Sequence, residues 1–424
     1  RTIGIGVAPI TIKEERAMTQ STGSFYELGV APKILERLDK LKFTIPTPIQ
    51  QKAIPPGIAG NDVMGVAQTG TGKTLAFAIP ILQRLAQVQG RALVLAPTRE
   101  LAIQINEVFT KMGPTMGMRT AVLIGGEPIR RQMQDLARDP RILIATPGRL
   151  IDHMQQHHVH LGDVTILVLD EADRMLDMGF APQIETIITC VAPKEYRQTM
   201  LFSATMPKAI IGIATACMKL PVHIEVAPSG TAAERVTQEL FVVKKEAKNA
   251  LLSKVLAQYH GSVLIFSRTK FGARKLTRTI RTMGHRSAEI HSDRTLSERR
   301  EALEGFKVGK YRVLVATDIA SRGIDVTGIE LVINYDLPDD AENYVHRIGR
   351  TGRAGHQGHA ISFATPEQKS DVRDIETLVK TVIPVAQHPE FPTEQFTKSA
   401  SAFKPRTFHH KGRGSGSGGF RPRR

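Results

Sequence analysis

The chain has 424 residues, of which 41% are hydrophobic and 23% are charged, and Lys plus Arg outnumber Asp plus Glu by 57 to 41. This apolar content excludes a chain that is disordered throughout, and the length predicts roughly two to three domains. The longest apolar runs, such as residues 165–169 and 263–266, are far shorter than the roughly 18 residues of a membrane-spanning helix. We therefore expect a globular protein without a membrane span.

The positive charge is concentrated in two blocks. Residues 268–286 contain seven Lys or Arg and no acid, and residues 398–424 contain eight and no acid, so the two blocks carry 15 of the 16 surplus charges. A surplus of this kind predicts a polyanionic partner. The rest of the chain is almost neutral.

The only two cysteines, Cys190 and Cys217, are too few for a disulfide framework and lack metal-ligand spacing. We interpret both as small buried hydrophobes in a reducing compartment, and predict a cytoplasmic location.

In chain order, residues 1–24 have little periodicity and no signal-peptide pattern, which predicts a flexible leader. An amphipathic helix is expected from Pro32, because apolar residues recur at helical spacing as far as Leu41. Continuous apolar runs follow at residues 63–66, 92–96, 141–145, 165–169 and 200–202, separated by helical stretches. Such runs are typical of a parallel sheet covered on both faces, so residues 25–222 are predicted to form an α/β domain.

A polar segment containing Pro228, Ser229 and Gly230 predicts a linker over residues 223–235. The pattern restarts with apolar runs at 263–266, 313–316, 331–334 and 360–363, so a second doubly wound domain is expected over residues 236–380. Over residues 381–424 the strand and helix patterns are lost and Lys, Arg, Gly and Ser become frequent, which predicts a disordered basic tail. Its arginines and scattered Phe residues could contact the backbone and bases of unpaired nucleic acid without reading sequence.

Residues 67–74 read Ala-Gln-Thr-Gly-Thr-Gly-Lys-Thr between an apolar run and a helical stretch. Glycines allow backbone N–H groups to surround a phosphate, a Lys supplies positive charge to the β and γ phosphates, and a Thr hydroxyl can bind Mg²⁺. A glycine-rich turn that caps a helix is the alternative. The predicted ATP-binding residues here are Thr69, Gly70, Thr71, Gly72, Lys73 and Thr74.

Two carboxylates, Asp170 and Glu171, directly follow the predicted strand 165–169. The carboxyl ends of parallel strands are where α/β proteins bind ligands. We predict that Asp170 holds Mg²⁺ together with Thr74, and that Glu171 polarises the attacking water. The alternative is an N-cap and an acidic first helical turn.

The second domain has no phosphate-binding loop of its own but contains the run His346-Arg-Ile-Gly-Arg-Thr-Gly-Arg353. Arginines supplied across an interface can stabilise the charge that develops on a transferring phosphoryl group. A basic surface turn is the alternative. We predict that one ATP binds between the domains, with Arg350 and Arg353 completing the site.

The order and spacing of these motifs resemble the DEAD-box ATP-dependent RNA helicases from Phe25 to about residue 365, and the short basic tail resembles the bacterial-type members. The resemblance implies two tandem RecA-like domains with ATP and RNA sites across their cleft. It places Gln50 and Phe25 at the adenine, Asp325 at the ribose, and the coupling of hydrolysis to closure at Ser203, Thr205 and His346. The RNA-binding residues that it implies are Thr98, Arg99, Gly126, Thr146, Arg149, Arg268, Thr317 and Arg322.

Three residues depart from the family pattern, namely Lys42, Ser292 and Leu296, and the last two lie in the RNA-facing region. We predict an RNA-stimulated ATPase that separates short duplexes, with RNA as partner, Mg²⁺ as cofactor, and ribosome-assembly or RNA-decay proteins as candidate protein partners. The alternatives are a helicase that acts on DNA, a non-catalytic RNA chaperone and, more distantly, a metal-dependent nuclease. The basic stripe at residues 270–281 is either a solvated face or a wall beside the RNA groove.

Overall fold

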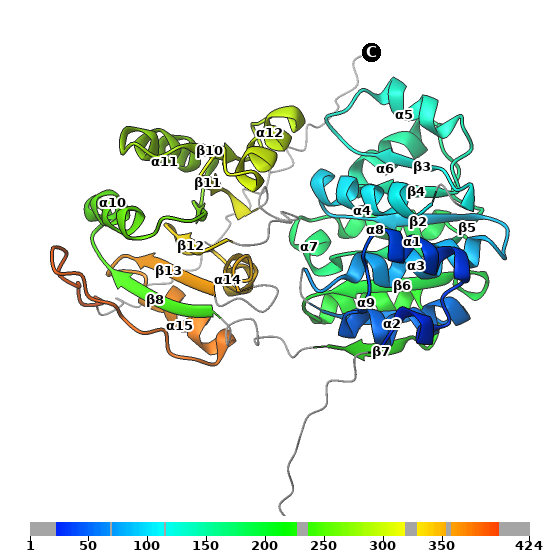
Figure 1. Ribbon diagram of the computed structural model, residues 1–424, viewed down its shortest axis with the longest axis horizontal. Coiled ribbons are helices and arrows are strands. Elements are labelled where there is room, and N and C mark those ends of the chain that lie inside the picture. The colour runs from blue at the N-terminus through cyan, green and yellow to red at the C-terminus, as the bar shows by residue number, and fades with distance from the viewer. Residues whose placement is uncertain are drawn as a thin grey trace, which may run out of the picture.

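The computed structural model describes residues 23–67, 70–113, 116–226, 236–318, 329–352 and 358–397. These residues form two lobes, each built around one sheet (Figure 1). All neighbouring strands in both sheets run parallel. The predicted pair of parallel-sheet α/β domains is thereby confirmed.

The sheet of the first lobe has the strand order β3-β4-β2-β5-β6-β1-β7. Its strands are β1 (Val63–Val66), β2 (Arg91–Leu95), β3 (Thr120–Leu123), β4 (Ile142–Ala145), β5 (Val164–Leu169), β6 (Gln198–Ser203) and β7 (Val222–Glu225). The helices are α1 (Pro32–Lys40), α2 (Pro48–Ala59), α3 (Lys73–Leu85), α4 (Arg99–Met112), α5 (Ile129–Leu136), α6 (Pro147–Gln155), α7 (Ala172–Asp177), α8 (Ala181–Cys190) and α9 (Lys208–Cys217).

Each central strand of this sheet contributes side chains to two cores. In β2, Val94 joins the core that includes α1 to α4, whereas Leu93 and Leu95 join the core that includes α6 to α9. Because side chains alternate along a strand, burial on both faces requires an unbroken apolar run. This is why the central strands could be recognised from the sequence.

The sheet of the second lobe has the order β10-β11-β9-β12-β13-β8. Its strands are β8 (Val236–Val242), β9 (Val263–Phe266), β10 (Ser287–Ile290), β11 (Val313–Ala316), β12 (Leu331–Asn334) and β13 (Gly358–Ala364). Helices α10 (Lys248–Gln258) and α11 (Lys270–Thr282) share one core with the sheet. The opposite core includes α12 (Leu296–Lys307), α14 (Ala341–Ile348) and α15 (Lys369–Val379).

The sequence did not reveal four strands, β3, β7, β8 and β10, and these are the edge strands of the two sheets. Their sequences mix polar and apolar residues, as in Ser-Ala-Glu-Ile of β10. These edge strands therefore lack the continuous apolar run by which the central strands were recognised.

The boundaries of the lobes differ from those expected. Strand β7 ends at Glu225, so the first three residues of the expected linker belong to the first sheet. The expectation of a disordered tail from residue 381 is wrong for its first part, since Leu240 of β8 donates to the Pro384 carbonyl and accepts from Ala386. Cys217 is buried as expected, but Cys190 is exposed.

Among the described residues, no helix is both long enough and apolar enough to cross a bilayer.

A chain that ends after Val382 should be less stable than one that ends after Thr397. It would lack Ile383, which is 3% exposed, and the backbone hydrogen bonds that residues 384–394 make to β8. Burial of one such side chain alone stabilises by about 1.5–3 kcal/mol, so we expect a decrease of about 3 kcal/mol in urea unfolding followed by circular dichroism. Equal stability of the two chains would show that residues 383–397 do not contribute to the fold.

Candidate active site

All the predicted site residues that the structure describes in the first lobe, apart from Gln50 and Phe25, follow the carboxyl ends of its strands. Lys73 begins the helix that follows β1, Asp170 follows β5, and Ser203 is the last residue of β6. The loops after β2, β3 and β4 carry Thr98, Gly126 and Thr146. Because the strand order is β3-β4-β2-β5-β6-β1, these two groups occupy opposite halves of one sheet edge. The residues predicted to bind the nucleotide and those predicted to bind RNA therefore lie side by side. We call these the nucleotide half and the RNA half of the edge.

Two glycines before α3 have backbone angles suited to a phosphate-binding turn. Gly70 and Gly72 adopt positive φ angles of 84° and 91°, a region that other residues rarely occupy. A side chain at Gly72 would also collide with the amide of Gln50. Lys73 is buried at the start of α3. Its ammonium donates to the carbonyl of Ala67 at 2.9 Å, and this hydrogen bond fixes the direction of the side chain.

Gln50 is fixed against this loop. Its Nε2 donates to the Gly72 carbonyl at 2.9 Å, and its Oε1 accepts from the Thr47 N–H at 2.9 Å as part of the capping box of α2. The ring of Phe25 is only 2% exposed and packs in the core, whereas Phe43, in the loop that leads to Thr47, is 43% exposed. Phe43 lies seven residues before Gln50, and its ring is the more accessible of the two.

Asp170 and Glu171 form a buried acidic pair at the end of β5. Burial raises the pKa of Asp170 to about 7, Lys73 opposes this shift, and Glu171 adds to it. Glu171 adopts the left-handed conformation, with φ 51° and ψ 52°, which is strained for a residue other than glycine. Its Oε2 accepts from Arg174 Nη1 at 2.7 Å, so the orientation of this carboxylate is fixed.

Asp173 connects this pair to the loop after β6. Its Oδ2 accepts from the N–H groups of Ala204 and Thr205 at 3.0 and 2.9 Å and from the Thr205 hydroxyl at 3.2 Å. The N–H of Asp173 donates to Ser203 Oγ. The structure thus brings together the two first-domain residues predicted to couple hydrolysis to closure.

The third predicted coupling residue, His346, comes to this cluster from the other lobe. Burial lowers its pKa to about 3, and the nearby cation Arg174 lowers it further while Asp173 opposes the shift. His346 and Arg350 line a narrow crevice with Arg174 of the first lobe. Arg350 is 2% exposed, and its Nε donates to the carbonyl of His346. Because Arg174 is also paired with Glu171, this crevice lies directly beside the acidic pair.

Arg347 lies next to His346 in the sequence, but its side chain has different partners. It donates to both carboxylate oxygens of Asp318, at 2.6 and 2.7 Å, and to Asn334 at 3.1 Å. A bidentate pair of this kind fixes geometry. Arg347 consequently positions the segment that carries Thr317, whereas Arg350 faces the first lobe.

The predicted RNA-binding residues of the first lobe form a second cluster. The guanidinium of Arg99 lies so close to Gly126 that a side chain there would collide with it. Arg149 Nη1 donates to the carbonyl of Glu127 at 3.1 Å, so both arginines hold the loop after β3. Thr98 and Thr146 are the N-caps of α4 and α6. Helix N-termini and arginines are both suited to phosphate groups.

In the second lobe, Arg268 follows β9 and Thr317 follows β11, so both lie at the carboxyl edge of that sheet. The guanidinium of Arg268 lies 3.1 Å from Asp339 and donates to the Leu337 carbonyl. Four predicted site residues, Thr69, Arg322, Asp325 and Arg353, lie outside the described residues.

Comparison with known proteins agrees with this geometry. The family model of the DEAD/DEAH box helicase matches residues 47–212, and that of the helicase conserved C-terminal domain matches residues 247–355. The ATP-dependent rRNA helicase RRP3 of Meyerozyma guilliermondii is 42% identical over 393 residues, which cover 89% of this chain and 82% of that protein. The RRP3 of Debaryomyces hansenii is 42% identical and covers 85% and 76%.

A solved structure, S. cerevisiae Dbp5 bound to RNA and ADP BeF3, is 32% identical with a TM-score of 0.76, and the match covers 85% of this chain and 95% of that chain. The chain belongs to the DEAD-box family of ATP-dependent RNA helicases. These relatives are yeast proteins and do not support the expectation of a bacterial-type member.

The two lobes of this helicase also meet at α12. Arg299 Nη2 lies 2.9 Å from Glu100 Oε2 of α4, and both side chains are largely buried. Leu296, where the family more often has Gln, joins the hydrophobic core of the first lobe. Arg300 forms a longer and more exposed pair of 3.5 Å with Glu127. Helix α12 therefore connects the second domain to the RNA half of the first.

The substitution Arg299→Ala should weaken the closed arrangement of this helicase. Removal of one partner of a buried pair leaves the other charge uncompensated, at a cost of about 3 kcal/mol or more. We expect the RNA concentration that half-stimulates ATP hydrolysis to rise at least about tenfold. Arg300→Ala is the matched control, and its exposed pair should account for less than about fivefold. Equal effects of the two variants would contradict a role of the buried pair in closure.

Proposed function

We propose that this helicase hydrolyses ATP when RNA holds its two domains together, and that closure distorts and separates short RNA duplexes. The observation that supports this most is the buried crevice in which Arg174, next to Glu171, meets His346 and Arg350. Hydrolysis at such a site depends on domain closure, because its residues come from both domains.

In the nucleotide half, the N–H groups of the loop at residues 70–73 and the Lys73 ammonium would bind the ATP phosphates. Gln50, fixed by Thr47 and Gly72, would read the base through its amide. The burial of Phe25 favours a structural role, and we assign the stacking of the base to the exposed Phe43.

The acidic pair fits a divalent cation. Asp170 is 2% exposed and its pKa is raised to about 7 by burial, so a cation beside it would offset a charge that burial disfavours. Mg²⁺ is usually held by one or two carboxylates together with substrate phosphates. Asp170 and the Thr74 hydroxyl would hold it, and when bound it supplies charge stabilisation to the phosphates.

The Glu171 carboxylate would orient the attacking water, because the ion pair with Arg174 keeps it in one direction. Arg350 would stabilise the negative charge that develops on the transferred phosphoryl group, and Arg353 is predicted to assist. Thr205 would couple domain closure to the acidic residues of the site. Its hydroxyl donates to Asp173 and also contacts Glu342 of the second domain.

The RNA backbone would contact both domains. The contacting residues would be Arg99, Gly126, Thr146 and Arg149 of the first domain and Arg268 and Thr317 of the second. The relatives are named rRNA helicases, which favours ribosomal RNA as substrate and ribosome-assembly proteins as partners. It also favours the compartment of ribosome assembly over a general cytoplasmic location. A comparison of ATPase stimulation by RNA and by DNA of the same sequence would test the choice of nucleic acid, since only the 2′-hydroxyl separates the two backbones.

Glu171→Gln should lower turnover by at least about 100-fold, because the amide cannot accept a proton from water as the carboxylate does. ATP binding should persist, since the phosphate loop is unchanged. RNA-stimulated phosphate release and equilibrium binding of a fluorescent ATP analogue measure the two effects. Glu185→Gln removes the same charge from an exposed position on α8 and should leave both unchanged. Retained turnover in Glu171→Gln would reject the assignment.

Phe43→Ala should weaken ATP binding about tenfold, because base–aromatic stacking contributes about 1–3 kcal/mol. Turnover at saturating ATP should stay close to that of the unchanged protein, since Phe43 is assigned to binding alone. Steady-state kinetics against ATP concentration separate the two quantities. Tyr26→Ala removes another exposed aromatic ring and is the control. An unchanged KM for ATP would exclude stacking on Phe43.

A further inference from the structure

Helix α11 carries the basic stripe whose role the sequence left open. Ala273, Leu276 and Ile280 face the core, so the helix is anchored to its sheet on one side. On the neighbouring side, the arginines at spacing i, i+4 and i+7 border the edge strand β10. With residues of β10 and of the following loop they line a pocket of about 270 Å³, formed by Arg274, Thr277, Arg278, Arg281, Glu289 and Arg294.

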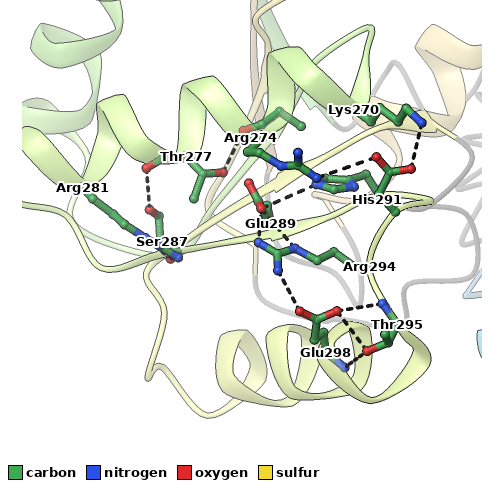
Figure 2. Close-up of polar contacts among 12 residues, drawn as sticks. Lys270, Arg274, Thr277, Arg281, Ser287, Glu289, His291, Arg294, Thr295 and Glu298 are labelled. Atoms are coloured by element: carbon green, nitrogen blue, oxygen red, sulfur yellow. Dashed lines mark hydrogen bonds and ion pairs between the residues drawn. The ribbon is translucent and has the colours of Figure 1, made fainter.

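Three of these arginines are held in place by neighbours (Figure 2). Arg281 donates twice to the Ser287 carbonyl, at 3.1 and 2.9 Å. Arg294 donates to Glu298 at 2.7 Å and to Glu289 at 3.1 Å. Arg274 lies 3.7 Å from Asp293. Guanidinium groups fixed in this way lose little further entropy when they bind an anion.

Arg278 differs from the other three. It is exposed, and across the described ranges no hydrogen bond or ion pair is found for its side chain. It can therefore bind a ligand without breaking an interaction inside the protein.

The charge of the lining selects the class of ligand. The lining holds four arginines and one carboxylate, Glu289, which is paired with Arg294 and has only 5% of its side chain exposed. Asp293 beside Arg274 and Glu298 beside Arg294 offset part of the positive charge from outside the lining, so the surplus is greatest at Arg278 and Arg281. No apolar side chain lines the pocket. The surplus charge suits an anion, and the lack of an apolar anchor disfavours a protein segment or a lipid chain.

The location of the pocket favours RNA over a free anion. Strand β10 neighbours β11, and β11 neighbours β9, so the loop with Asp293 and Arg294 lies on the sheet edge that carries Thr317 and Arg268. From there, Arg274 to Arg281 extend about 10 Å along α11. Over that length a nucleic-acid strand presents more than one phosphate. The pocket thus continues the proposed RNA path past the outer edge of the second domain.

We propose that this arginine pocket binds the phosphodiester backbone of an RNA strand that extends beyond the inter-domain cleft. This proposal rests on the proposed function of the cleft as an RNA site. The contact is independent of sequence, because it consists of guanidinium groups and phosphates. It anchors long RNA to the second domain.

The test uses the full chain and two single-stranded RNAs, one of about 6 nucleotides that fits the cleft and one of about 20 that reaches the pocket. Affinity is measured at several salt concentrations with a bound ATP analogue. Arg278→Glu should weaken binding of the long RNA about tenfold and lower the slope of log affinity against log salt by about 0.7 for each phosphate that the pocket no longer neutralises. Binding of the short RNA, and turnover when it is saturating, should not change.

Arg373→Glu, which makes the same charge change at an exposed position on α15, is the matched control. Arg278→Lys should restore most of the binding. An equal decrease in Arg278→Glu and Arg373→Glu would overturn the proposal, as would equal effects on both RNAs. Tripolyphosphate that binds through Arg278 and leaves long-RNA affinity intact would assign the pocket to a soluble anion instead. A failure of the proposed function of the cleft would be seen separately. In that case, the short RNA would not stimulate ATP hydrolysis even by the protein without substitutions.

Discussion

The parallel arrangement of both sheets is the constraint on which the rest of the molecule depends. Every strand delivers its carboxyl end to the same edge, so residues far apart in the chain, such as Lys73, Asp170 and Ser203, follow neighbouring strands. The strand order then separates the residues predicted to bind the nucleotide from those predicted to bind RNA along the edge of the first sheet. A second sheet of the same kind supplies the remaining groups across the cleft.

Burial of charge connects that architecture to regulation. Asp173 is buried and accepts three hydrogen bonds from residues 204–205, and Glu171 is held by Arg174. Charges in such a place are costly unless their partners are present. Because His346 and Arg350 come from the second domain, the energetics of the groups that we propose as catalytic depend on the position of that domain. This dependence gives a physical reason why hydrolysis should follow closure.

Much of the fold could be predicted because most central strands of a doubly covered sheet contain a continuous apolar run. The four edge strands could not, since their composition does not distinguish them from loops. Residues 383–397 were expected to be disordered because they lack periodicity, yet they pair with β8 through backbone groups that leave no pattern in the sequence. Phe25 and Phe43 show the same limit for the site: both are aromatic, and only burial separates the core residue from the exposed one.

The sequence by itself determined the chemistry, because a phosphate loop, an acidic pair and a run of arginines are combinations of residue types that suit ATP. It also determined that two α/β domains share that chemistry. Only the tertiary structure decided which side chains act together. Packing assigns Arg347 to Asp318 and Arg350 to the cleft, and it converts part of the surplus charge into a pocket of four arginines. Such assignments depend on the distances between segments that are far apart in the chain, and the order of residues alone does not give these distances.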